Sequence, residues 1–105
     1  MEGKFFHFDA RLGIPVPNLQ KEWDNYSAEE QTKIIFRWES IRGNIPDRIK
    51  TLEDGINHKQ EKLYQEDSFT ESCKLNTEIA ELASIINDLW LLYRMDQHIE
   101  SKLHK

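Results

Sequence analysis

From Ile56 to its C-terminus the chain contains neither glycine nor proline. These two residues interrupt helices most strongly, so this half of the chain can form long, unbroken helices. Apolar residues recur at steps of four and three from Leu75 to Tyr93, and a second apolar row that begins at Ile85 runs beside them. The pattern predicts a helix over residues 69–103 with two apolar faces.

Residues 46–66 form a second predicted helix. Pro46 suits a first turn, because its missing N–H would have no helical partner there. Ser68 and Glu71 form a capping box that begins the next helix after a short turn. Apolar residues follow a seam at Ile45, Ile49, Leu52, Ile56 and Leu63, with Lys59 at the missing position. We therefore expect residues 46–66 and 69–103 to form an antiparallel helical hairpin.

A third helix is expected over residues 28–42. Ser27 and Glu30 have the spacing of a capping box at its start. Its apolar stripe predicts that Trp38 belongs to the core. Gly43 and Asn44 are expected to end it with a left-handed residue.

The first 17 residues are predicted to be an extended arm, because they contain two prolines and show no helical period. Three aromatic residues, Phe5, Phe6 and Phe8, favour an arm that packs along the helices. The alternative is a docking segment, since residues 14–17 read Ile-Pro-Val-Pro and have polyproline character.

The predicted fold is all-α: a long antiparallel helical hairpin plus a shorter helix, forming a three-helix bundle with an extended N-terminal arm. Residues 1–105 are expected to form a single domain, because single domains commonly have about 100–150 residues. Only 4 glycines and 3 prolines argue against an all-β sandwich.

Charge and cysteine content exclude several classes of protein. The net charge of −5 disfavours binding to nucleic acid. Cys73 is the only cysteine, so no disulfide can form within the chain, and a cytoplasmic location is expected. We expect Cys73 to be half-buried. No apolar run is long enough to cross a membrane, so no membrane partner is expected.

The last predicted helix is longer than its partner, which leaves part of its apolar surface to be covered. We therefore predict a non-enzymatic protein–protein interaction module, without cofactor or catalytic residue, that forms a coiled-coil homodimer or higher homo-oligomer, or docks to another protein. Trp90 is the expected anchor. The predicted interface consists of Leu89, Trp90, Leu92, Tyr93, Ile99 and Leu103.

The alternative is a magnesium-dependent phosphohydrolase. Glu78, Glu81 and Asp88 lie on one side of the predicted helix, and Mg²⁺ prefers such oxygen ligands. The Glu-Ile-Ala-Glu segment over residues 78–81 is similar to the ExxE segment of all-α nucleotide pyrophosphohydrolases of the MazG type. The resemblance implies a second acidic pair of the form ExxD, but Glu100 is followed three residues later by Leu103.

Overall fold

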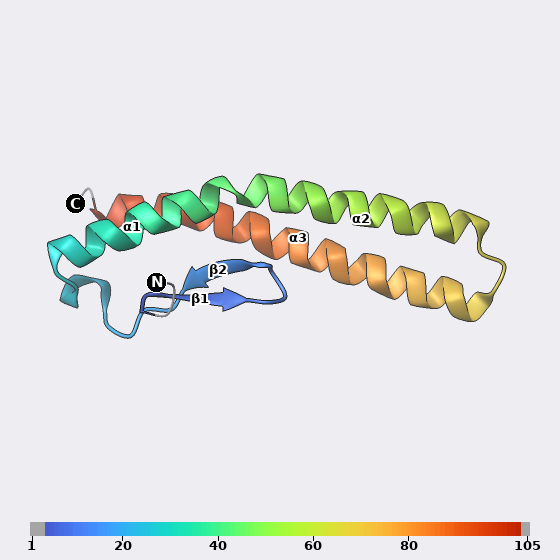
Figure 1. Cartoon of the computed structure of the whole chain (residues 1–105), viewed down its shortest axis with the longest axis horizontal. Helices are drawn as coiled ribbons and strands as arrows, with labels where there is room; N and C mark the ends of the chain where they lie inside the picture. Colours follow the sequence, from blue (N-terminus) through green and yellow to red (C-terminus); the bar gives the residue numbers. More distant parts are fainter. Residues whose placement is uncertain (1–3, 104–105) are drawn as a thin grey trace.

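The computed structural model describes the backbone of residues 4–103 and the side chains of residues 4–94. The chain forms an elongated molecule of 59 × 23 × 18 Å, with helices along its long axis and a small β-hairpin at one side (Figure 1). Helices account for 73% of the chain, which confirms the mostly helical prediction. The β-hairpin was not predicted.

Helix α1 spans Ala28–Gly43 and begins at the expected capping box. The hydroxyl oxygen of Ser27 accepts a hydrogen bond from the Glu30 N–H, at 3.1 Å. The Ser27 N–H in turn donates to the Glu30 carboxylate, at 3.1 Å, and this bond holds the pKa of Glu30 below its ordinary value. Trp38 is buried on the inner side of α1, as predicted.

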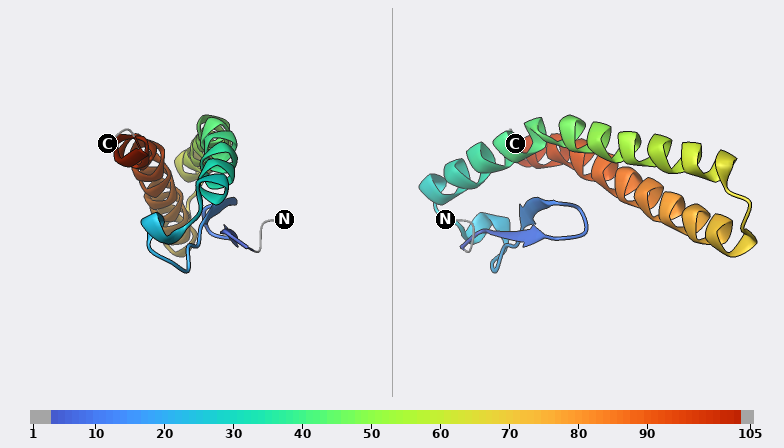
Figure 2. Two further views of the ribbon diagram at one scale, coloured as in Figure 1. Left: turned by 90° about the vertical axis from the view of Figure 1, so that its left-hand side faces the viewer. Right: turned by 45° about the vertical axis from the view of Figure 1, so that its right-hand side comes forward.

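Helix α2, Ile45–Gln65, follows α1 after a single residue. The predicted left-handed end of α1 is wrong, because Gly13 is the only glycine with positive φ in the described part of the chain. Asn44 has φ −94° and ψ −7°, close to helical values, so the chain passes from one helix to the next with only a bend. The two helices lie roughly end to end beside α3 (Figures 1 and 2), which is a different arrangement from the predicted three-helix bundle.

Helix α3, Phe69–Leu103, runs antiparallel to α2 and then past α1, as Figure 2 shows. The Glu71 N–H donates to the hydroxyl of Ser68 at 3.3 Å, so the expected serine cap is present. With 35 residues against 21, α3 is longer than α2, as predicted. The two helices approach closely at Gly55, where an added Cβ would lie 3.5 Å from the Leu82 side chain.

The predicted extended arm is instead an antiparallel β-hairpin. Strand β1 spans Phe6–Asp9 and strand β2 spans Ile14–Pro17, with Phe6 opposite Pro17 and Asp9 opposite Ile14. The backbone is extended, as expected, but the two halves of the arm pair with each other. Sequence reasoning missed the pairing because prolines rarely occur inside strands.

The tip of the β-hairpin is fixed to the helices. Arg48 of α2 donates from Nε to the carbonyl oxygen of Leu12, at 2.9 Å. Its guanidinium lies against Gly13 and leaves no room for a side chain there. Gly13 also has φ +77°, which favours glycine. The Asp9 carboxylate accepts from the Leu12 N–H at 2.9 Å and shapes the turn. The arm is therefore docked, which favours the packing interpretation.

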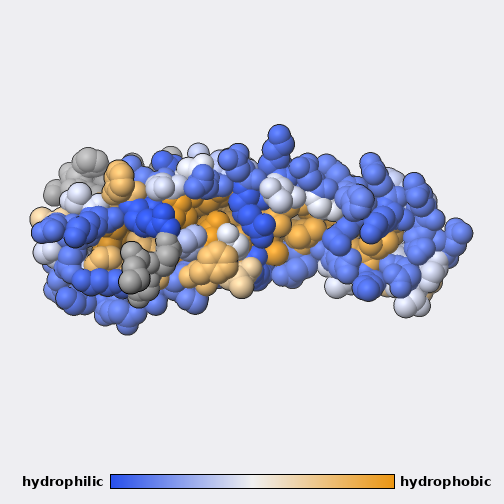
Figure 3. All heavy atoms as spheres, viewed as in Figure 1, coloured by the Kyte–Doolittle hydropathy of each residue, from blue (hydrophilic) through white to orange (hydrophobic). Residues whose placement is uncertain are grey.

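One hydrophobic core joins the hairpin to all three helices. Figure 3 shows apolar surface along the middle of one face, between the helices and the hairpin. Its buried residues are Phe6, Leu12, Ile14, Tyr26, Ile34, Trp38, Ile41, Ile45, Ile49, Leu52, Ile85 and Leu89. The buried Tyr26 hydroxyl accepts from the backbone N–H groups of Gln20 and Lys21, at 2.9 and 3.2 Å. Cys73, expected to be half-buried, is exposed because it lies beyond this core.

Candidate functional site

Two of the three candidate metal-binding carboxylates are bound by an arginine of the β-hairpin. Arg11 donates to Glu81 at 3.2 Å, to Asp88 at 2.7 Å and to the hydroxyl of Ser84 at 2.8 Å. The hydrogen bond that Arg11 donates to Asp88 is the main reason why the pKa of Arg11 is raised. A guanidinium thus occupies the position between the carboxylates where a cation would have to bind.

The third carboxylate, Glu78, faces a different cation. It accepts from Lys59 of α2 at 3.0 Å, and both side chains are partly exposed. Lys59 is the residue that interrupts the apolar seam of α2, so this ion pair explains how a lysine fits at that position. The described part of the chain contains no group of three histidine, cysteine or acidic residues that could hold a metal ion. The structure therefore does not bring Glu78, Glu81 and Asp88 together as one metal site.

The Lys59–Glu78 pair predicts a pH dependence of stability. The hydrogen bond from Lys59 lowers the pKa of Glu78 in the folded chain below its ordinary value of 4.5. The stabilisation is therefore complete above pH 4.5 and is lost as the pH falls through the lower folded value. We expect Glu78→Gln to make the free energy of unfolding depend less steeply on pH below 4.5.

Urea denaturation at pH 7 and at several values below pH 4.5 would measure this difference. Glu61→Gln, at an exposed position on α2, is the matched control and should keep the wild-type slope. An unchanged slope in Glu78→Gln would contradict the role of the pair.

The six predicted interface residues fall into four groups. Leu89 is 0% exposed and belongs to the chain's own core. Leu92 and Tyr93 are half-buried and pack against that core. The side chains of Ile99 and Leu103 lie outside the described residues. Trp90, the expected anchor, keeps 39% of its surface exposed.

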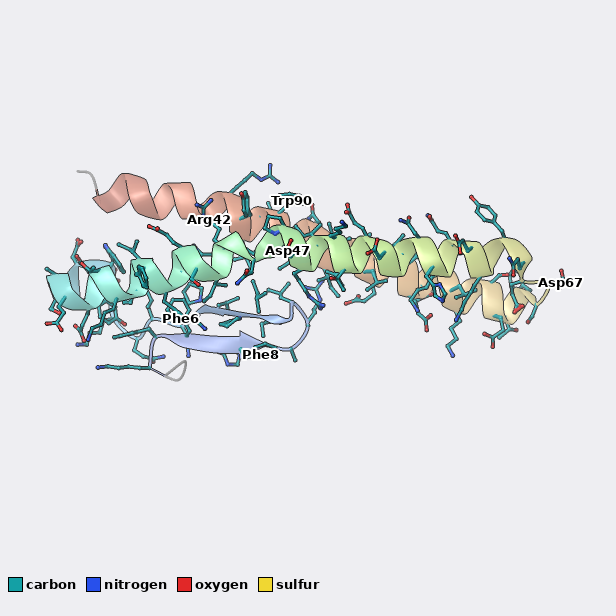
Figure 4. All side chains as sticks on the ribbon, turned by 45° about the horizontal axis from the view of Figure 1, so that its top comes forward. Phe6, Phe8, Arg42, Asp47, Asp67 and Trp90 are labelled. Atoms are coloured by element: carbon teal, nitrogen blue, oxygen red, sulfur yellow. The ribbon has the colours of Figure 1, made fainter. Side chains whose placement is uncertain are left out.

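Trp90 is held in place from one side. Its ring meets the ring of Tyr93 edge to face, with centroids 5.6 Å apart. The guanidinium of Arg42, near the end of α1, lies over the ring of Tyr93, 5.2 Å from its centroid. Figure 4 shows Trp90 on α3 beside this end of α1. The tryptophan is thus positioned by its neighbours while much of its surface stays in contact with solvent.

A shallow groove of about 420 Å³ lies between α2 and α3 on the same side of α3 as Trp90. Its α3 wall contains Ala83 and Ile86, and Trp90 follows on the same face of the helix, seven residues after Ala83 and four after Ile86. The lining residues, called the α2–α3 groove below, are Glu53, Ile56, Asn57, Gln60, Ala83 and Ile86. The isoleucines are only partly buried, so apolar surface is exposed between the helices.

Sequence reasoning did not anticipate all the apolar surface that these two helices expose. Leu91 is 49% exposed but was not among the predicted residues, because it falls outside both apolar rows of α3. Ile56 and Ile86 were interpreted only as seam residues. Their partial exposure depends on how closely the two helices approach, which the helical period alone does not determine.

No family model, curated protein or solved structure matches the chain. Among the described helices, none combines the length and the apolar content that a bilayer crossing requires.

Proposed function

We propose that the protein is a non-enzymatic, self-associating interaction module, and that a second copy packs against Trp90 and the α2–α3 groove. The observation that carries this proposal is Trp90 itself, a large aromatic residue that is 39% exposed beside a partly apolar groove. Tryptophan is among the residues that contribute most to binding energy when an interface buries them.

The shape of the chain supports a second copy as the occupant. The accessible surface is 7519 Å², whereas a compact protein of 12.5 kDa would expose about 6,200 Å². The radius of gyration is 18.0 Å, against about 13 Å for a compact chain of this length. The difference between the observed surface area and that of a compact protein exceeds the roughly 800 Å² that each partner buries in a stable interface.

The structure also supports a geometry for this association. Two antiparallel helices form a single layer, and the β-hairpin binds α3 on the side of Glu81 and Asp88. The groove side is left without a second layer, although stable domains usually bury an apolar helix face against one. A second helical hairpin on that side would complete a four-helix arrangement around Ile56 and Ile86.

Light scattering after size-exclusion chromatography tests the proposal directly. The expected mass is twice 12.5 kDa at micromolar concentration. Trp90→Ser should raise the dissociation constant at least about tenfold, measured by analytical ultracentrifugation, because it removes a central aromatic contact.

Phe36→Ser is the matched control, because Phe36 is 77% exposed on α1 and lies away from the groove. The control should dimerise like the wild type. A wild-type protein that stays monomeric at all accessible concentrations, or a Trp90→Ser variant that dimerises normally, would contradict the proposal.

A further inference from the structure

The two strands of the β-hairpin differ in which backbone groups face outward. In an antiparallel pair, alternate residues direct their N–H and C=O groups towards the partner strand. The Asn18 N–H donates to the carbonyl oxygen of Phe5, at 2.8 Å, so the backbone groups of Phe5 face the second strand. His7, two residues further and opposite Val16, faces the same way. The backbone groups of Phe6 and Phe8 therefore face away from β2.

The outer edge of β2 is closed to a further strand. Pro15 and Pro17 lie opposite Phe8 and Phe6 and thus occupy the outward-facing positions of β2. Proline has no N–H, so neither position can donate to an added strand, and such residues protect sheet edges in natural proteins. β2 also packs against α1.

The outer edge of β1 has no such protection. It contains no proline, and β1 is the outer strand in Figure 1. Phe6 and Phe8 point to the same side of the strand, but Phe6 is 4% exposed and Phe8 is 56% exposed. In Figure 4, Phe8 is labelled at β1, the strand of the hairpin that lies farther from the helices. An exposed aromatic side chain thus lies beside an open edge of the sheet.

We propose that the outer edge of β1 binds an extended peptide segment of another protein by strand addition, so that the peptide becomes the third strand of the sheet. The outward N–H and C=O groups of Phe6 and Phe8 provide its hydrogen bonds. An apolar side chain of the peptide packs against Phe8, since residues opposite each other in a sheet lie in contact.

The size of the edge indicates a peptide as the occupant instead of a second copy. Strand β1 has four residues, of which two face outward. This edge is much smaller than the roughly 800 Å² that each partner contributes to a stable dimer. It lies on the β-hairpin, so strand addition does not depend on the association proposed for the α2–α3 groove.

Phe8→Pro tests strand addition with little effect on the hairpin. It removes one outward N–H and leaves the bonds towards β2 in place, as Pro15 and Pro17 do in the neighbouring strand. The probe is a displayed library of random heptapeptides, selected on the immobilised full chain, and the most enriched peptide is then synthesised. In calorimetry we expect the Phe8→Pro variant to bind this peptide at least tenfold more weakly. Phe8→Val keeps the N–H and changes only the side chain, so it should weaken peptide binding less than Phe8→Pro does.

Hydrogen exchange provides a second readout that does not depend on a variant. Bound peptide should slow the exchange of the Phe6 and Phe8 amide protons. As a separate control for the α2–α3 groove, Trp90→Ser should leave the affinity for the peptide unchanged. The proposal would be overturned by a selection that enriches no peptide, or by a bound peptide that leaves the Phe6 and Phe8 amides unprotected. It would also be overturned if the wild type is a dimer that Phe8→Pro dissociates, because this result would assign the edge to a second copy.

Discussion

Leu89→Ala is expected to lower the free energy of unfolding by about 3 kcal/mol, because the change removes a fully buried leucine and leaves a cavity. In a domain of this size, that loss corresponds to a fall in Tm of about 15 °C. Leu89 lies in the core that also contains Ile45 and Ile49 of α2. Urea denaturation followed by circular dichroism would measure the effect.

Leu91→Ala is the matched control, since Leu91 is 49% exposed and two residues away on the same helix. It should change the free energy of unfolding by less than about 1 kcal/mol. The loss in Leu89→Ala should not depend on protein concentration, because the contacts are within one chain. A loss that disappears on dilution would mean that Leu89 is an intermolecular contact after all.

Gly13→Ala is expected to lower the free energy of unfolding by about 2 kcal/mol. Gly13 has φ +77°, where a residue with a Cβ is strained by about 1–2 kcal/mol. The added Cβ would also lie 2.7 Å from the guanidinium of Arg48 and would displace it from the Leu12 carbonyl, a hydrogen bond worth about 1 kcal/mol. Thermal denaturation should show a fall in Tm of about 10 °C.

Gly43→Ala provides the opposite control. Nothing lies within 4 Å of a Cβ at Gly43, which ends α1 without positive φ, so alanine should be neutral or stabilise the chain by up to about 1 kcal/mol. Equal losses in the two variants would mean that Arg48 and the turn do not restrict position 13.

The helices were predictable because their signals are local. A capping box needs only Ser27 and Glu30, and the absence of glycine and proline after Gly55 is enough to favour long helices. The bend at Asn44 was not predictable in this way. Gly43 is typical of a left-handed helix end, but α1 and α2 both contribute to one core, and this packing favours a nearly continuous path.

The docking of the β-hairpin and the candidate site depend on contacts between distant parts of the chain. Arg11 gives no local signal, and its importance arises from Glu81 and Asp88, which belong to another element. The period of α3 likewise showed that Leu89 and Trp90 are close to apolar rows. It did not show which of them faces inward, because that depends on where α1 and α2 lie around α3.

The contacts of Arg11 also have a consequence for the order in which the chain folds as it is synthesised. The residues that Arg11 binds follow it by 70 to 77 positions. At about 5–20 residues per second, the ribosome needs several seconds to make this length of chain. The β-hairpin is therefore synthesised well before α3, and its contacts with α3 form late, when the middle of α3 has left the exit tunnel. Until then Phe6 and Ile14, which the finished protein buries, can be covered only by α1 and α2.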